Sequence, residues 1–395
     1  MSQVTIVSEV DDEGFAEILD QVRVFVRKEV VPREREIAET DAIPADLRAL
    51  AADMGLFGYA LPQEYGGLGL HLAQDVELAF HFGYTSLSFR SLFGTNNGIA
   101  GQVLVGYGTD EQKQAWLPRL ASGEVIASFA LTEPEAGSDP SGMRTSARKV
   151  DDGWVINGNK RFITNAPLAG LFVVFARVQE DAPKPRIAVF LVPADSPGLE
   201  VAAKDKKMGQ EGASTADLTF SDVQVPDDAL ISGDIDTGFH AAMSVLARGR
   251  VHISALAVGV MERALEESVR FSAVNLQGGK PTGDQQLVQA MLAEQKVLAM
   301  AGKQMTREAA RLYVSGEDRR LAPSATKLFC TESAGRVVDL AVQTHGGSGY
   351  MRETTVERLF RDARLLRLYE GTSEIQKLIV GRELVRRERA GKSVI

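Results

Sequence analysis

The chain has 395 residues, 44% of them hydrophobic and 25% charged, which is ordinary for a globular protein and long enough for two or three packed lobes. Its formal net charge of −9 argues against non-specific nucleic-acid binding, which needs a clustered basic face. Its single cysteine, Cys330, excludes an internal disulfide and fits a reducing compartment.

The first residues of the chain resemble no targeting segment. They read Met1-Ser2-Gln3-Val4 and continue into an acidic patch from Glu9 to Glu13, without the basic start of a secretory signal or the arginines of a transit peptide. No apolar run reaches the roughly 18 residues needed to span a bilayer. We therefore expect a cytoplasmic protein with no membrane insertion.

Residues 1–125 are predicted to form an N-terminal helical domain. Its first apolar stripe recurs at helical spacing and consists of Phe15, Ile18, Leu19, Val22, Val26 and Val30. Pro32 marks a kink or an end of that helix. The composition of residues 62–69 predicts a loop, and a second helical region follows up to Leu120.

Residues 126–235 are predicted to form a small β-domain. Runs rich in β-branched and aromatic residues, such as 154–156, 172–175 and 187–192, are separated by turn signals such as Asn157-Gly158. Short strands with this punctuation favour an antiparallel sandwich or barrel over alternating strands and helices.

Residues 236–395 are predicted to form a C-terminal helical domain resembling a four-helix bundle. Two long apolar stripes support helices, and residues 251–260 are apolar nearly all round, which predicts a helix buried between others. The fold class is therefore α+β and multidomain.

The sequence lacks several common site motifs. No GxGxxG follows a strand, no GxxxxGK[ST] loop occurs, and none of the five histidines stands in a metal-ligand pattern, so no metal is predicted. Each histidine is interpreted as a structural or surface residue, and Cys330 as a small core residue.

Four stretches, taken together and in order, resemble the FAD-dependent acyl-CoA dehydrogenase family. They read LTEPEAGSD at 131–139, GNKRFITN at 158–165, QTHGGSGY at 343–350, and RDA at 361–363 leading to YEGTSEIQ at 369–376. The resemblance covers nearly the whole chain and agrees with the helix–β–helix order.

The resemblance implies FAD as the cofactor and names residues around its flavin ring. The backbone at Phe129 and Leu131, together with Thr132, would contact the ring, and Ser138 would lie near phosphate or substrate. Phe162 and Thr164 alternate with Ile163, so we expect both on one face of a strand, with the aromatic against the ring and the hydroxyl on its N5 atom. Taken alone, the first segment also fits a surface turn and the second an ordinary sheet aromatic.

Further residues are assigned by resemblance to the adenosine end of FAD. Gln343, Gly346 and Gly347 would contact the cofactor of a neighbouring subunit, which implies a homotetramer or a homodimer. A plain helix terminator is locally an equally good interpretation of the two glycines. The remaining residues assigned to cofactor binding are Gln286, Thr372 and Glu374.

Glu370 is the predicted catalytic base. Dehydrogenating a saturated thioester removes an α-proton and a β-hydride, so a positioned carboxylate and polarisation of the carbonyl are both needed. Members of the family carry the base either at the Tyr-Glu-Gly-Thr position, here Glu370, or just before the arginine of the buried helix, here Gly249 before Arg250. Gly249 cannot act as a base. Arg250 and Gly371 would help bind the substrate, as would Ser138, although a structural ion pair is nearly as good an interpretation of Arg250.

The sequence departs from the family pattern after the long buried helix. Asn275 stands where an arginine usually reaches a neighbour's pyrophosphate, and Gly278 replaces an aromatic, so a charge-assisted phosphate contact is lost. Arg90 lies 18 positions before Gly108, a spacing at which members acting on dicarboxylyl thioesters carry an arginine for the distal carboxylate. An ordinary surface or interdomain arginine is the commoner interpretation.

The predicted function is α,β-dehydrogenation of an acyl-CoA to the trans-2-enoyl-CoA, with electrons passed to an electron-transfer flavoprotein. The alternatives are an oxygen-using oxidase or flavin monooxygenase, a glutaryl-type dehydrogenase that uses Arg90, and a non-enzymatic binding protein of the same fold. A basic C-terminal run from Arg382 to Lys392 would suit the last, but Glu383 and Glu388 interrupt it.

Overall fold

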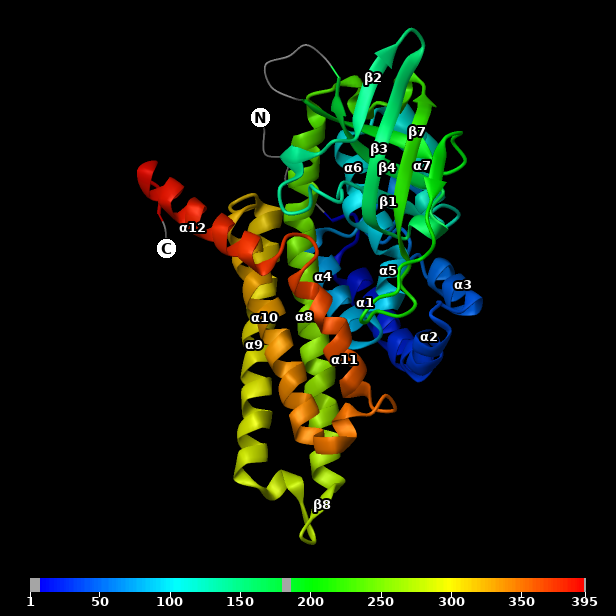
Figure 1. Ribbon diagram of the computed structural model, residues 1–395. Coiled ribbons are helices and arrows are strands. Elements are labelled where there is room, and N and C mark those ends of the chain that lie inside the picture. The colour runs from blue at the N-terminus through cyan, green and yellow to red at the C-terminus, as the bar shows by residue number, and fades with distance from the viewer. Residues whose placement is uncertain (1–7, 180–185, 394–395) are drawn as a thin grey trace.

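The computed structural model describes residues 8–179 and 186–393, and it places a mixed sheet beside one end of a long helical bundle (Figure 1). The order of helical, β and helical regions confirms the predicted architecture. The N-terminal helices are α1 (Asp12–Phe25), α2 (Glu34–Thr40), α3 (Ala45–Asp53), α4 (Leu72–Tyr84), α5 (Leu87–Asn97), α6 (Ile99–Tyr107) and α7 (Asp110–Ala121).

The first apolar stripe forms a helix that changes its pitch. Val22, Val26 and Val30 are buried, but a π-helical turn at Val26–Val30 and a 3₁₀ turn at Val31–Arg33 separate α1 from α2. Pro32 lies in the 3₁₀ turn, where its ring cannot donate the hydrogen bond that would continue a regular helix.

The sheet is mixed, which corrects the expectation of a wholly antiparallel β-domain. Its strands are β1 (Ala127–Ala130), β2 (Ser146–Val150), β3 (Gly153–Thr164), β4 (Leu171–Val178), β5 (Ile187–Pro193), β6 (Leu199–Val201) and β7 (Thr215–Val225). β1 and β2 pair in parallel with successive parts of β4, and the other pairings are antiparallel. β1 and β2 therefore lie end to end along β4, and the loop 131–145 connects them outside the sheet.

The apolar run in β4 reflects burial on both faces of the sheet. Leu171, Val173 and Phe175 belong to a cluster shared with helices α6 and α7, whereas the residues between them belong to a second cluster within the β-domain. A strand covered on both sides reads as a continuous apolar run, because neither face meets water.

The C-terminal region is built on α8 (Thr237–Val274), which packs against α4 and the later helices. The other elements are β8 (Leu276–Gln277), β9 (Lys280–Pro281), α9 (Gln286–Ser315), α10 (Leu321–His345), α11 (Thr355–Ala363) and α12 (Ser373–Arg389). α8 is long and apolar enough to cross a membrane by composition, but 83% of its most apolar window is buried inside the protein. It is a core helix.

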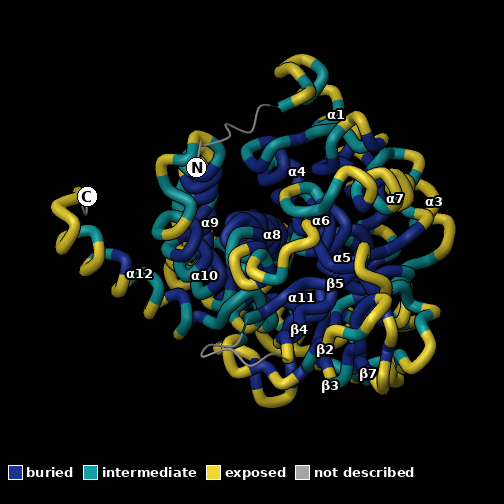
Figure 2. Tube along the Cα trace, turned by 90° about the horizontal axis from the view of Figure 1, so that it is seen from above, coloured by how far each residue is buried: buried dark blue, intermediate teal, exposed yellow. Residues whose placement is uncertain are grey.

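Two glycines bring α4 and α8 into close contact. A Cβ at Gly83 would lie 2.2 Å from the Leu256 carbonyl oxygen, and one at Gly259 would lie 2.3 Å from the Phe80 carbonyl oxygen. The two helices share one buried core with α1, α9, α10 and α11. By contrast, α12 projects away from the body of the protein and is exposed over much of its length (Figures 1 and 2).

Candidate active site

A cleft lies where the sheet, the N-terminal helices and α8 meet. It encloses about 1240 Å³ of space, including part that is open to solvent. Of the residues singled out from the sequence, the cleft brings together Arg90, Phe129, Leu131, Thr132, Phe162, Thr164, Glu370 and Gly371. These residues come from all three regions of the chain, so the cleft exists only in the folded protein.

Glu370 lies on the bundle side of the cleft in a strained turn. Its φ of 52° places a non-glycine residue in the left-handed region, and Gly371 follows with a φ of 91°. The Oε2 atom of Glu370 is buried and receives no hydrogen bond from the described residues. Burial raises the pKa of the Glu370 carboxyl above its ordinary value, and the charges of Arg90, Lys327, Arg250 and Arg248 oppose the rise.

The space for this carboxylate is made by Gly249 on α8. A Cβ at Gly249 would lie 2.0 Å from Oε2 of Glu370 and 2.9 Å from its Cδ. Positions 249 and 370, which the resemblance gave as the two alternative locations of the base, are thus neighbours in space. Any side chain at position 249 would occupy the space that the Glu370 carboxylate now fills.

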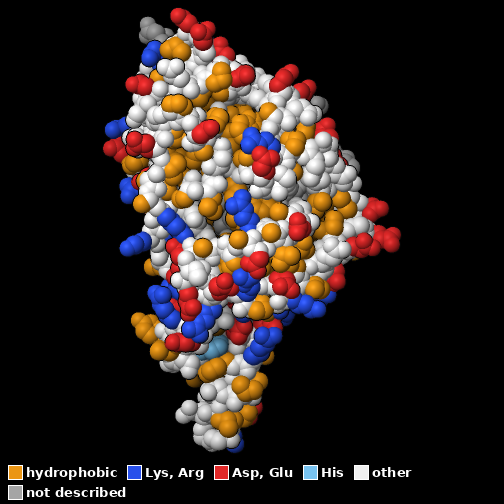
Figure 3. All heavy atoms as spheres, turned by 90° about the vertical axis from the view of Figure 1, so that its right-hand side faces the viewer, with side chains coloured by type: hydrophobic (Ala, Val, Ile, Leu, Met, Phe, Trp, Pro, Cys, Tyr) orange, Lys and Arg blue, Asp and Glu red, His pale blue; other side chains and the backbone are white. Residues whose placement is uncertain are grey.

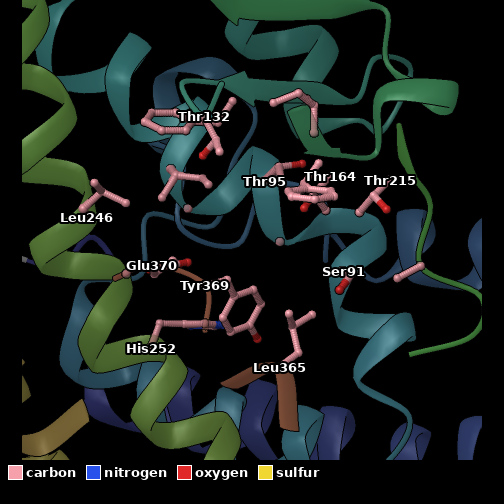
Figure 4. Close-up of a pocket in the computed structure, with 18 of the residues that line it drawn as sticks. Ser91, Thr95, Thr132, Thr164, Thr215, Leu246, His252, Leu365, Tyr369 and Glu370 are labelled. Atoms are coloured by element: carbon pink, nitrogen blue, oxygen red, sulfur yellow. The ribbon is translucent and has the colours of Figure 1, made fainter. Parts of the chain in front are cut away.

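The opposite wall of the cleft comes from the β-domain. Figure 4 shows Thr132 and Thr164 across the open space from Glu370 and Tyr369. Phe162 also lines the cleft, and its side chain is 59% exposed. A bulge between Lys160 and Ile163 interrupts the pairing of β3 with β7 and gives Phe162 a positive φ of 57°. Despite the bulge, Phe162 and Thr164 both line the cleft, whereas the Ile163 side chain is 2% exposed and belongs to the buried core of the β-domain, as the alternation predicted.

A buried ion pair holds the loop that carries Thr132. The Glu133 carboxylate accepts hydrogen bonds from Lys160 Nζ at 2.8 Å and from the backbone N–H groups of Arg144 at 2.6 Å and Thr145 at 3.0 Å. Lys160 Nζ also donates to the Leu131 carbonyl at 3.2 Å. Burial lowers the pKa of Lys160 to about 8, and Glu133 opposes that shift. The glutamate of this loop thus fixes its path.

A charged network lies beside Glu370. Arg90 Nε donates to His252 Nε2 at 2.8 Å, so the other ring nitrogen, Nδ1, carries the proton and donates to Asp75 Oδ1 at 2.8 Å. Burial lowers the pKa of His252, which agrees with a neutral ring. Asp75 also accepts from the Tyr59 hydroxyl at 3.0 Å and pairs with Arg248 at 2.8 Å. The network holds Arg90 in the cleft wall without an acidic partner for its terminal nitrogens among the described residues.

Other predicted site residues lie outside the cleft lining. Ser138 is exposed in the loop 131–145, Thr372 caps α12 by accepting from the Ile375 N–H, and Glu374 is exposed in the first turn of that helix. Arg250 is buried, makes no ion pair within the described part of the chain, and leaves its Nε without a hydrogen bond. A structural ion pair therefore does not account for Arg250.

Several residues predicted to bind the cofactor, including those assigned to a neighbour's FAD, gather at the end of the bundle away from the sheet. Exposed residues there include Gln286 at the start of α9 and Gln343, Gly346 and Gly347 at the end of α10. Stacking of Phe271 on His345, with ring centroids 4.3 Å apart, joins the ends of α8 and α10. Asn275 ends α8 at the same place, and Gly278 and Gly279 form the turn between β8 and β9 with φ values of 61° and 80°. Glycine suits this tight hairpin, whereas an aromatic would be strained there.

Several residues of the cleft were not found from the sequence. Asp75, Tyr59, His252 and Arg248 form the network at Arg90, and Lys327 reaches the turn at Glu370. One sequence feature could have indicated the buried network, namely the polar residue His252 within the otherwise apolar helix at 251–260. Within residues 8–179 and 186–393, no group of three or more histidine, cysteine or acidic side chains could hold a metal ion.

The chain matches three family models along its length. They are described as the N-terminal, middle and C-terminal domains of acyl-CoA dehydrogenase, and they match residues 12–124, 128–223 and 236–385. An acyl-CoA dehydrogenase of Bacillus subtilis is 35% identical over 92% of this chain and 96% of its own length.

Solved structures agree with these matches. The butyryl-CoA dehydrogenase of Megasphaera elsdenii superposes with a TM-score of 0.90 at 30% identity, over 96% of this chain and all of the other. A glutaryl-CoA dehydrogenase of Mycobacterium smegmatis in complex with FADH2 gives a TM-score of 0.89 at 29% identity, over 95% of each chain.

Proposed function

Because the chain belongs to the acyl-CoA dehydrogenase family, we propose that it dehydrogenates an acyl-CoA thioester between its α and β carbons, with Glu370 as the base. It is an oxidoreductase, and FAD is its family's cofactor. The observation that carries the proposal is the Oε2 atom of Glu370, which is buried beside a cleft and receives no hydrogen bond from the described residues.

The wall opposite Glu370 fits a flavin ring. It offers an exposed aromatic at Phe162, hydroxyl groups at Thr132 and Thr164, and the backbone of β1 at Phe129 and Leu131. A flat ring with a few polar edge atoms suits an apolar wall with a few polar groups. These residues would hold the ring, and FAD, when bound, supplies the acceptor for the β-hydride.

Glu370 would remove the α-proton from the other side of the thioester. A carboxylate whose pKa is raised by burial is a stronger base than an ordinary glutamate, and the nearby cations oppose that rise. The backbone N–H of Glu370 donates to no acceptor in the described part of the chain. We propose that this N–H binds the thioester carbonyl and stabilises the charge that develops there.

The remaining parts of the proposal concern partners and location. Electrons would pass to an electron-transfer flavoprotein, in a cytoplasmic protein that assembles as a homotetramer or homodimer. Large apolar side chains are exposed on α9 and α12, among them Leu287 at 80%, Val297 at 63% and Val385 at 52%, which a neighbouring subunit would cover. On the face in Figure 3, acidic and basic side chains are interspersed, which does not favour a nucleic-acid partner.

Anaerobic bleaching of the flavin tests this function. The purified protein should be yellow, and one of a panel of saturated acyl-CoA thioesters of different lengths should bleach it. Glu370→Gln should bind FAD and the thioester but bleach at least 10²-fold more slowly, since a general base contributes about 10²–10⁴-fold. Equal rates for the two proteins would refute the role of Glu370. Rapid turnover with oxygen and formation of peroxide would instead support an oxidase.

Arg90 supports a second candidate, a thioester with a distal carboxylate. Its guanidinium lines the cleft, is held through Nε by His252, and has no acidic partner among the described residues. A guanidinium with free terminal N–H groups suits a carboxylate. Glutaryl-CoA should then be turned over faster than butyryl-CoA, and Arg90→Met should reverse that preference. Preference for butyryl-CoA in the unaltered protein would exclude this candidate.

A further inference from the structure

Lys327 on α10 is buried, and its ammonium group reaches the turn that carries Glu370. Lys327 Nζ donates to the carbonyl oxygen of Tyr369 at 2.9 Å and to that of Gly371 at 2.7 Å. The side chain is fully inaccessible to solvent, and no carboxylate forms an ion pair with it in the described part of the chain. Burying an ammonium is costly, and the two carbonyl oxygens together with the charge of Glu370 offset part of that cost.

The turn that Lys327 holds needs external support. Glu370 and Gly371 both have positive φ, a conformation that a glutamate adopts only at a cost in free energy. Gln376 Nε2 donates to the carbonyl oxygens of Glu370 at 3.3 Å and Gly371 at 2.9 Å. Lys327 and Gln376 together therefore bind all three carbonyl groups of residues 369–371, which fixes the orientation of the peptide groups on both sides of Glu370.

A second anchor on α10 reinforces the first. Glu332 accepts from Arg367 at 2.9 Å before the turn and from the Ser373 hydroxyl at 2.5 Å after it. Side chains of α10 thus bind residues 367–373 before the turn, at the turn and after it. Of the two α10 side chains, Lys327 and Glu332, only Lys327 binds residues 369–371 directly.

We propose that Lys327 is a positioning residue for the base: it holds the peptide groups flanking Glu370 so that the carboxylate and the N–H of residue 370 both face the thioester. The inference rests on the proposed function. The charge of Lys327 also opposes the burial that raises the pKa of Glu370. The lysine therefore has two separable effects, one geometric and one electrostatic.

Two substitutions separate these effects. Lys327→Met removes the hydrogen bonds and the charge, whereas Lys327→Gln keeps N–H donors but removes the charge. We expect Lys327→Met to lower kcat by about 10²-fold, the loss typical of a misplacement of about 1 Å, with a smaller change in KM. Lys327→Gln should keep more of kcat, and its rising pH limb should move to higher pH, because the pKa of Glu370 increases when a cation is lost.

Binding of a 3-thia-acyl-CoA, whose α-proton is acidic enough to leave without hydride transfer, gives a second readout. Its long-wavelength absorbance with the flavin should decrease in both variants at neutral pH. Lys303→Met, which removes a partly exposed lysine paired with Glu262 on the neighbouring helix, is the control and should behave like the unaltered protein.

Each outcome is decisive for the inference. Unchanged kcat, pH limb and absorbance in folded, FAD-loaded Lys327→Met and Lys327→Gln would overturn it. Loss of the fold or of FAD in Lys327→Gln would also overturn it, because the lysine would then support the whole domain rather than the base. Failure of the unaltered protein to bleach with any acyl-CoA would instead refute the proposed function.

Discussion

Gly249→Ala should disable the base although Glu370 itself is left unchanged in the sequence. The added Cβ would lie 2.0 Å from Oε2 of Glu370, whereas real carbon contacts are essentially never shorter than 3.0 Å. The carboxylate must therefore move by about 1 Å, and a displacement of that size can cost about 10²-fold in rate. Because Gly249 lies within α8, the alanine should otherwise favour the helix by about 0.5–1 kcal/mol.

The assay is anaerobic stopped-flow bleaching with the best thioester from the panel. Gly106→Ala is the matched control, because Gly106 also lies in a helix but its added Cβ would meet no atom within 4 Å. We expect a loss of about 10²-fold for Gly249→Ala and no loss for the control. In a Glu370→Gln background, Gly249→Ala should add no further loss. A wild-type rate for Gly249→Ala, or an additive loss in the double variant, would refute the reasoning.

Three further predictions concern the cofactor, the buried network and pH. Asn275→Arg should tighten FAD binding by restoring a charge-assisted phosphate contact, and fluorescence titration of the apoprotein would contradict this if affinity stayed equal or fell. Asp75→Asn should lower the free energy of unfolding by about 3–5 kcal/mol, because the buried Arg248 loses its charged partner and His252 and Tyr59 lose a charged acceptor; urea unfolding that shows less than about 1 kcal/mol would count against it. Because the pKa of Glu370 is raised and the base must be ionised, kcat/KM should fall as pH drops through a value above the ordinary glutamate range. An activity that stays level down to pH 4 would contradict that prediction.

Features that depend on the local residue pattern could be predicted from the sequence. The stripe from Phe15 to Val30 predicted a helix because apolar spacing follows the helical repeat, and the apolar circumference of residues 251–260 predicted a buried helix. Resemblance over four segments predicted the family and its cofactor, which the comparisons confirm. The parallel pairing of β1 and β2 with β4 could not be read in this way, because strand direction depends on where a chain returns to the sheet.

The sequence by itself determined the order of the three regions, which follows from residue type and spacing along the chain, and its resemblance to the family named the candidate base. Only the tertiary structure decided what surrounds Glu370. Gly249, Lys327 and Arg90 lie far from it in sequence, and helix packing alone brings them beside its carboxyl group. Electrostatic and steric effects act over a few ångströms in space, so the reactivity of this glutamate depends on tertiary contacts that only the folded chain provides.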